Sequence, residues 1–157
     1  MGSGNGYWTY MLRRFEQGKK KLEVIPVDSG MSEWRTLWVP DTVEADGVKW
    51  LKQNNWGRDD VLLLVYPNTG EDFTSKMIKA YGKRAPLRQW RPIADNGAAG
   101  TTIISAGSQN ASGFTGFATE TIADWMAREL PQWRKVFQIP LPSFAGKDEA
   151  LFAFEKK

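Results

Sequence analysis

The sequence predicts an α/β layer fold with a mostly parallel sheet. Strand-like and helix-like hydrophobic patterns alternate along the chain, which is typical of successive β-α-β units with right-handed crossovers. The most apolar segment, residues 60–67, contains five consecutive aliphatic residues between turn residues, as expected for a strand covered on both faces. With 157 residues, the chain is long enough for a real core, and we expect a single domain over residues 1–157.

A helix is expected over residues 6–17. Apolar side chains recur there at i, i+3, i+4 and i+7 from Trp8 to Phe15, which gives the helix one apolar face. A short buried strand is expected next, over residues 22–27. Pro26 is awkward in the middle of a sheet because it has no amide to donate to a ladder hydrogen bond.

The remaining elements continue the alternation. They are expected as strands at residues 42–45, 60–67, 101–107, 133–139 and 150–154, and as helices at residues 47–54, 72–81 and 119–130, the last two capped by Asp72 and Thr119. The final two strands are expected to form a terminal antiparallel hairpin at one edge of the sheet. Residues 83–100 are basic at first and then rich in small residues, so we interpret them as a flexible loop insertion.

The composition excludes several classes of enzyme. The chain contains no histidine and no cysteine, which makes Ser-His-Asp hydrolases, Cys-His enzymes and zinc hydrolases improbable, and we expect no metal site. The net charge of +3 is too small to indicate nucleic acid binding by itself. No segment is long and apolar enough to span a membrane and no secretory signal is visible, so a cytoplasmic location is expected.

The candidate site residues follow the predicted strands, because ligands of open α/β sheets bind at the carboxyl ends of the strands. A glycine-rich turn opens the chain, and glycine there lets the backbone approach a ligand beside a helix N-terminus. An acidic residue about 20 positions further on can accept both ribose hydroxyls of a nucleotide. The candidates are the loop glycines Gly2, Gly4 and Gly6, the acidic Asp28, the pair Asp46 and Gly47, the turn Tyr66, Pro67 and Asn68, and the polar run Ser108, Gln109 and Asn110.

Each of these signals has a structural alternative. The glycine turn can be a flexible end, and Asp28 in Asp-Ser-Gly can simply be a turn residue. Asp46 can cap a helix instead of binding the exocyclic amine of an adenine. Tyr66 can belong to a strand-ending turn, and the run that begins at Ser108 can be a polar loop rather than the substrate side of a site.

Taken in order, these segments resemble the class I S-adenosylmethionine-dependent methyltransferases. The resemblance lies in GSGNGYW, VIPVDSG, VEADGVKWL and LLLVYPNTG, and the terminal WRKVFQIPLPSF and ALFAFEKK are similar to the reversed hairpin that ends that fold. It covers nearly the whole chain. It implies a Rossmann-like three-layer fold, the cofactor S-adenosylmethionine and methyl transfer to an acceptor that the motifs do not identify.

The resemblance also implies a role for each site residue. Gly2, Gly4 and Gly6 would lie along the methionine and ribose of the cofactor, Asp28 would hold the ribose, Asp46 with Gly47 would meet the adenine, and Tyr66 with Pro67 would face the methyl-transfer site. Methyl transfer is an in-line displacement from a reactive sulfonium, so positioning and desolvation supply most of the acceleration. The lack of histidine and cysteine is therefore compatible with this chemistry.

Two departures from the family pattern are visible. The Asn/Asp-Pro-Pro-aromatic motif of enzymes that methylate amino groups reads Tyr-Pro-Asn at residues 66–68, so that substrate class does not carry over. The first strand of the family's sheet, which precedes the glycine loop, has no counterpart in the sequence. The chain could be a fragment or carry a misplaced start, or another chain, as in a homo-oligomer, or another segment could fill the gap. The second and fourth strands of the family's sheet could also pair directly. We expect the fold to survive with the affinity for the cofactor reduced or lost.

Two other functions are compatible with the sequence. The chain could be a non-catalytic relative that keeps the scaffold as a structural or binding module. It could also bind nucleic acid through the basic segment that contains Lys83, Arg84, Arg88, Trp90 and Arg91, because basic residues beside an aromatic ring can hold phosphates and stack on bases. Such segments are more often only solvated.

Overall fold

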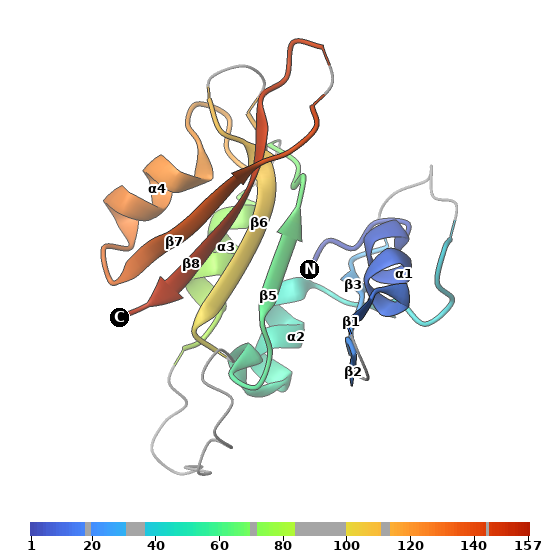
Figure 1. Ribbon diagram of the computed structural model, residues 1–157. Coiled ribbons are helices and arrows are strands. Elements are labelled where there is room, and N and C mark those ends of the chain that lie inside the picture. Colours follow the sequence, from blue (N-terminus) through green and yellow to red (C-terminus); the bar gives the residue numbers. More distant parts are fainter. Residues whose placement is uncertain (18–19, 31–36, 70–71, 84–99, 111–113, 144) are drawn as a thin grey trace. The chain divides into compact units, whose positions relative to one another are not determined.

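A computed structural model describes residues 1–157 except 18–19, 31–36, 70–71, 84–99, 111–113 and 144. The described residues form a mixed α/β structure with four α-helices and several strands (Figure 1). The chain divides into two compact units, Met1–Trp50 and Leu51–Lys157. A single methyltransferase-like domain over residues 1–157 stays a prediction, and most of the expected insertion at 83–100 lies outside the described residues.

The first unit contains the predicted N-terminal helix, α1 (Tyr7–Arg14). Two arginines stand in its last turn, where positive charge is favourable to the helix dipole. Its apolar face is largely exposed, because the side chains of Trp8 and Phe15 are 46% and 58% accessible. The rings of Tyr7 and Tyr10 each lie 5.4 Å from the ring of Trp38. This helix therefore packs through an aromatic group near its start rather than along the whole predicted face.

Two short strand pairs complete the first unit. β1 (Glu16–Gln17) pairs antiparallel with β2 (Lys20–Lys21), and β3 (Val27–Asp28) pairs in parallel with β4 (Val43–Glu44). The strand expected over 22–27 is reduced to β3. Pro26 accepts a hydrogen bond from the Val43 N–H at 2.9 Å but has no amide to return one, so the ladder begins only after it. The first hairpin was not predicted.

Helix α2 (Gly47–Gln53) follows β4 at the predicted place and leads into the 3-10 turn Asn55–Gly57. The second unit then contains a sheet and two helices. In chain order these are β5 (Leu62–Val65), α3 (Phe73–Ala80), β6 (Thr102–Ser108), α4 (Ile122–Glu129), β7 (Trp133–Pro140) and β8 (Glu149–Lys156). Helix α4 starts two residues later than predicted, since Thr121 rather than Thr119 is its N-cap.

The sheet of the second unit has the order β5-β6-β8-β7 (Figure 1). Strands β5 and β6 are parallel, as predicted, and β7 and β8 form the predicted antiparallel hairpin. The strands β5, β6 and β7 run in one direction and only β8, which lies between β6 and β7, is reversed, so the expected mostly parallel sheet with an antiparallel strand from the terminal hairpin is confirmed for this sheet. The β6–β8 pairing is thereby antiparallel as well.

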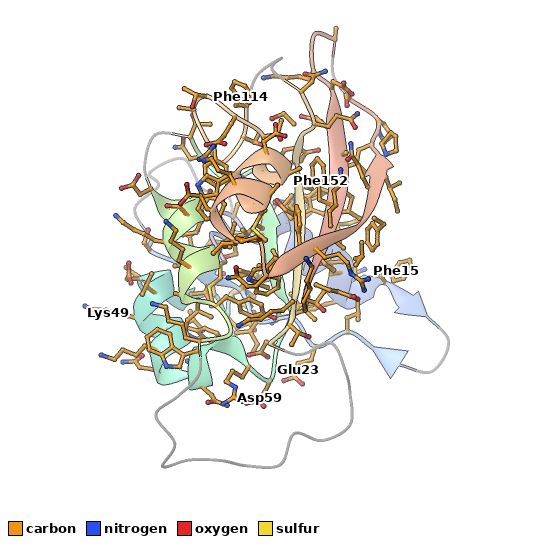
Figure 2. All side chains as sticks on the ribbon, turned by 90° about the vertical axis from the view of Figure 1, so that its left-hand side faces the viewer. Phe15, Glu23, Lys49, Asp59, Phe114 and Phe152 are labelled. Atoms are coloured by element: carbon orange, nitrogen blue, oxygen red, sulfur yellow. The ribbon has the colours of Figure 1, made fainter. Side chains whose placement is uncertain are left out.

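The core of the second unit lies on one face of this sheet. Leu64, Ser105 and Phe152 stand opposite one another on β5, β6 and β8, and each is at most 2% exposed. Helices α3 and α4 lie on one side of the sheet (Figure 1), and Figure 2 shows Phe152 among the packed side chains. The two helices are joined by an ion pair of 3.7 Å between the Lys79 Nζ and the Glu129 Oε2.

The opposite face of the sheet is also apolar. Phe137 and Ile139 on β7 share it with Ala153 and Leu151 on β8, and the two β7 side chains are 42% and 51% exposed. A three-layer fold needs helices on both faces of its sheet, whereas α3 and α4 cover one. The mixed α/β class is therefore established, and the three-layer Rossmann-like arrangement stays a prediction.

Candidate functional site

The glycine loop before α1 has the backbone conformation that only glycine adopts readily. Gly2, Gly4 and Gly6 have φ angles of 64°, 54° and 80°, all in the left-handed region. Gly6 is the N-cap of the helix. A Cβ atom at Gly6 would lie 2.5 Å from the Val39 Cγ2, so the loop packs closely on this buried valine. The left-handed backbone conformation at these three positions thus explains why they are glycines.

Asp28, at the end of β3, holds the glycine loop. Its Oδ2 accepts a hydrogen bond of 2.8 Å from the Gly4 N–H, and its Oδ1 accepts one of 3.0 Å from the Gly30 N–H. The Ser3 N–H also donates to the carbonyl of Val27 at 3.0 Å. The structure therefore brings together two of the predicted cofactor elements, the loop and the acidic residue. The bond to Gly30 also fits the alternative reading of Asp28 as a turn residue.

Asp46 follows the neighbouring parallel strand, β4. Its Oδ1 accepts a hydrogen bond of 2.8 Å from the Lys49 N–H, and its carbonyl accepts one of 2.9 Å from the Trp50 N–H. Asp46 therefore caps α2, which starts at Gly47, as its structural alternative predicts. Sequence reasoning missed Glu44. Its carboxylate lies against Gly30, where a Cβ atom would stand 2.7 Å from the Glu44 Oε1.

A second polar group lies at the carboxyl end of β5. The Tyr66 N–H donates to the carbonyl of Ala106 at 2.9 Å, which extends the parallel ladder by one residue. Tyr66 then has a φ of 45°, a left-handed value that is costly for a residue with a side chain. Its hydroxyl donates to the Oε2 of Glu149 at 3.1 Å. Burial raises the pKa of the Tyr66 phenol, and the hydrogen bond to Glu149 and the charge of that carboxylate act in the same direction.

The rest of the predicted turn adjoins this group. The carbonyl of Pro67 accepts a hydrogen bond of 2.8 Å from the Gly116 N–H, and Asn68 is exposed. Gly116 also lines an open hollow of about 260 Å³ together with Phe117, Asp72 and Glu120. The turn after β5 is therefore held against the loop that follows β6.

The polar run after β6 is held by its own loop. Ser108 is 2% exposed, its N–H donates to the Thr115 Oγ1, and its Oγ accepts from the Thr115 N–H, both at 3.0 Å. The side-chain amides of Gln109 and Asn110 donate to the two carboxylate oxygens of Asp148. Asp148, directly before β8, thus supplies a partner at the same end of the sheet as Tyr66.

Sequence reasoning missed Glu149, which is 7% exposed and stands opposite Ser108 in the β6–β8 pairing. The signal that could have found it is the antiparallel register of β8, which places its first residue at the carboxyl end of β6. The structure thus shows two groups of predicted residues. The first unit joins the glycine loop to Asp28, and the second joins Tyr66 and Pro67 to the residues that begin at Ser108.

The predicted nucleic acid segment is described only at its start. The Nζ of Lys83 lies 5.4 Å from the centre of the Trp56 ring. Arg84, Arg88, Trp90 and Arg91 lie outside the described residues. Nucleic acid binding therefore stays a prediction.

No protein family model, curated protein or solved structure matches the chain. Within the part of the chain that the structure describes, no helix is long and apolar enough to cross a bilayer.

Proposed function

We propose that this chain is an S-adenosylmethionine-dependent methyltransferase-like protein with a Rossmann-like three-layer fold and an unassigned methyl acceptor. The bond between the Gly4 N–H and the Asp28 carboxylate supports this most. An acidic residue at the end of a parallel strand, facing a glycine loop that leads into a helix, is the arrangement by which nucleotide-binding α/β units hold a ribose and its neighbouring groups.

Asp28 keeps the capacity to bind a ligand as well. Each oxygen of an ionised carboxylate has two acceptor positions, and the bonds from Gly4 and Gly30 use one on each. Burial lowers the pKa of the α-amino group of Met1, and the charge of Asp28 acts in the opposite direction and raises it. A ribose hydroxyl could take a remaining position. In this proposal Gly2 and Gly6 shape the loop along the cofactor, and Asp46 with Gly47 stands beside the adenine. The Tyr66 turn, with Pro67 and Asn68, forms the acceptor side.

The alternative is a non-catalytic methyltransferase-like scaffold. It is favoured by the helix cap at Asp46, whose Oδ1 already accepts the Lys49 N–H, and by the two amides on Asp28. Both observations lead us to expect weak cofactor binding. We also propose a cytoplasmic location and a homo-oligomer.

Isothermal titration with S-adenosylmethionine tests the proposed cofactor site. We expect binding weaker than micromolar, with a melting temperature that rises at high cofactor concentration because a ligand of the folded state stabilises it. Asp28→Asn should weaken binding about 10- to 150-fold, since a hydrogen bond to a charged group contributes roughly 1.5–3 kcal/mol. The matched control is Asp41→Asn, which removes a carboxylate of the same unit that pairs with Arg13 instead.

The outcomes separate the readings. No binding at millimolar cofactor, or equal losses in the Asp28→Asn and Asp41→Asn variants, would contradict the proposed site. Micromolar binding would instead contradict the expectation of a weakened site and favour an active enzyme.

A further inference from the structure

The apolar side of α1 faces solvent. The buried side chain of this helix is the polar Thr9, which is 4% exposed. Trp8 and Met11 in the helix and Phe15 directly after it follow the spacing of one helical stripe, and they are 46%, 45% and 58% exposed. A surface helix normally turns its apolar stripe toward the core. Helix α1 therefore presents outward the side chains that such a helix usually buries.

Ring contacts connect this stripe to a second exposed segment of the first unit. The ring of Tyr7 lies 5.6 Å from the ring of Trp8 and 5.4 Å from the ring of Trp38. Leu37 precedes Trp38 and is exposed as well. Contiguous exposed apolar surface marks a place where a protein binds another molecule or a membrane. We call this surface the aromatic patch, and it consists of Tyr7, Trp8, Met11, Phe15, Leu37 and Trp38.

Positive charge follows the aromatic patch along the chain. Arg14 stands in the last turn of α1 and is exposed, and β2 consists of Lys20 and Lys21. Glu16 is the one acidic residue in the sequence from 7 to 21, and it stands opposite Lys21 in the β1–β2 pairing. Arg13 adds little to this charge, because it pairs with a carboxylate at 2.8 Å. The segment that continues the patch is therefore basic.

The chemistry of the patch distinguishes between possible partners. Tyr7 meets both tryptophans edge to face, and the guanidinium of Arg14 lies 4.4 Å from the centre of the Tyr10 ring. Stacking of nucleic acid bases needs open ring faces, and the non-aromatic Met11 and Leu37 offer none. A two-fold contact between two copies would bring the basic segments of both to one interface, where like charges repel.

An anionic lipid surface accommodates both parts of this region. Tryptophan and tyrosine rings are favourable at the level of the lipid headgroups, and an outward apolar helix face can enter the boundary between headgroups and acyl chains. Lysine and arginine beside such a face are attracted to the negative charge of the lipids. This mode of binding needs no helix that crosses the bilayer.

We propose that the aromatic patch, together with Arg14 and the lysine pair of β2, docks the protein peripherally on an anionic lipid surface. Trp8 and Phe15 enter the headgroup boundary, and the cations interact with the lipid phosphates and carboxylates. This function is additional to the proposed methyl transfer and does not rest on it.

Flotation of the full chain with lipid vesicles tests the apolar part of the contact. We expect the protein to float with vesicles rich in phosphatidylserine and to stay behind with vesicles of phosphatidylcholine alone. Phe15→Ser should weaken binding about tenfold or more, because it removes a large apolar side chain from the contact. The matched control is Phe137→Ser, which removes an exposed phenylalanine of the second unit and should leave the affinity unchanged. Circular dichroism of each variant verifies that it is folded.

A pair of double variants tests the electrostatic part. Lys20→Gln combined with Lys21→Gln should weaken binding to the phosphatidylserine vesicles roughly 30-fold, since each cation near an anionic surface contributes about fivefold. Lys49→Gln combined with Lys52→Gln removes two exposed lysines of α2 and should change the affinity little. Added salt should weaken binding of the unchanged protein, because it screens exposed charges.

Several results would overturn the inference. Absence of binding, equal binding to the two kinds of vesicle, or full affinity in Phe15→Ser would each contradict the lipid contact. A single-stranded RNA that competes with the vesicles would assign the patch to nucleic acid, and a dimer that Phe15→Ser dissociates would assign it to a second copy. None of these measurements involves S-adenosylmethionine. The lipid contact and the Asp28 site can therefore fail independently.

Discussion

Gly116 lies where the turn after β5 and the start of α3 come together. It has a φ of 79°, and its N–H donates to the carbonyl of Pro67 at 2.8 Å. A Cβ atom there would stand 3.0 Å from both the Pro67 Cγ and the Thr74 Oγ1. Thr74 is fully buried, so its side chain has little space into which it could shift to accommodate the added atom.

We predict that Gly116→Ala destabilises the protein by about 2–5 kcal/mol, because a left-handed alanine costs roughly 1–2 kcal/mol and crowding in a packed site adds about 1–3 kcal/mol. Urea unfolding followed by circular dichroism measures it. Gly146→Ala is the matched control. Gly146 has a φ of 77° but nothing within 4 Å of an added Cβ, so it should show only the backbone part. Equal losses would show that crowding at Gly116 is negligible.

The residues of the candidate sites were predictable to different degrees. Asp28 and Gly4 are 24 positions apart, and a known spacing between loop and acidic residue connects them. Tyr66 and Glu149 are 83 positions apart, and only the register of β8 brings them together. The spacing of residues in the sequence can predict contacts within one local unit. A contact across a sheet depends on the order of the strands, which short sequence motifs do not predict.

Helix α4 shows how a cap fixes an element boundary. The Thr121 Oγ1 accepts a hydrogen bond of 3.2 Å from the Asp124 N–H and donates one of 2.7 Å to the Asp124 Oδ2. Thr121 is 7% exposed, so water cannot easily replace these bonds. Thr119 is exposed and lies two residues before the cap.

Thr121→Ala should destabilise the second unit by about 1 kcal/mol, the usual cost of losing an N-cap side chain. Thr119→Ala provides the control, because the same change at an exposed site outside the helix should alter stability by less than about 0.5 kcal/mol. Urea midpoints of the two variants, measured together, decide between the capping positions. A larger loss of stability in Thr119→Ala than in Thr121→Ala would indicate that Thr119 caps the helix, as the sequence alone predicts.

At the scale of elements, long patterns were more informative than short ones. The apolar run at residues 60–67 and the β-branched run at residues 101–107 became β5 and β6. The strand predicted over 22–27 did not form as a whole, because Pro26 interrupts the donors of its ladder. Two-residue strands such as β1 carry too few side chains to create a detectable period.

The whole second unit depends on rows of side chains that cross its sheet. One row joins Leu62, Ile103 and Phe154, and the next joins Leu64, Ser105 and Phe152. All six side chains are at most 3% exposed. The rows join strands from distant parts of the chain into one core. A substitution in one row should therefore lower the stability of the whole unit.

Phe152→Ala should cost about 3–5 kcal/mol of unfolding free energy, since it removes a buried ring and leaves a cavity. Phe137→Ala makes the same chemical change on the neighbouring strand at a side chain that is 42% exposed, and its cost should be clearly smaller. Chemical unfolding of both variants tests this. Similar costs would indicate that the β7 face of the sheet is covered in solution.

The topology of the whole molecule was predictable in part. Alternating helices and strands predicted the parallel pairs β3–β4 and β5–β6, and turn-rich residues 140–149 predicted the final hairpin. The sequence did not show which strand of that hairpin joins β6. Both strands are apolar enough to do so, and the choice depends on packing between residues far apart in the chain.

The position of β8 has a consequence for the synthesis of the protein. β8 lies between β6 and β7, yet it follows both along the chain. Until residues 149–156 have been synthesised, β6 has no partner on that edge. An unpaired edge of this kind is a template for association with other chains. The nascent protein should therefore be most prone to aggregation, and most dependent on chaperones, just before its sheet closes.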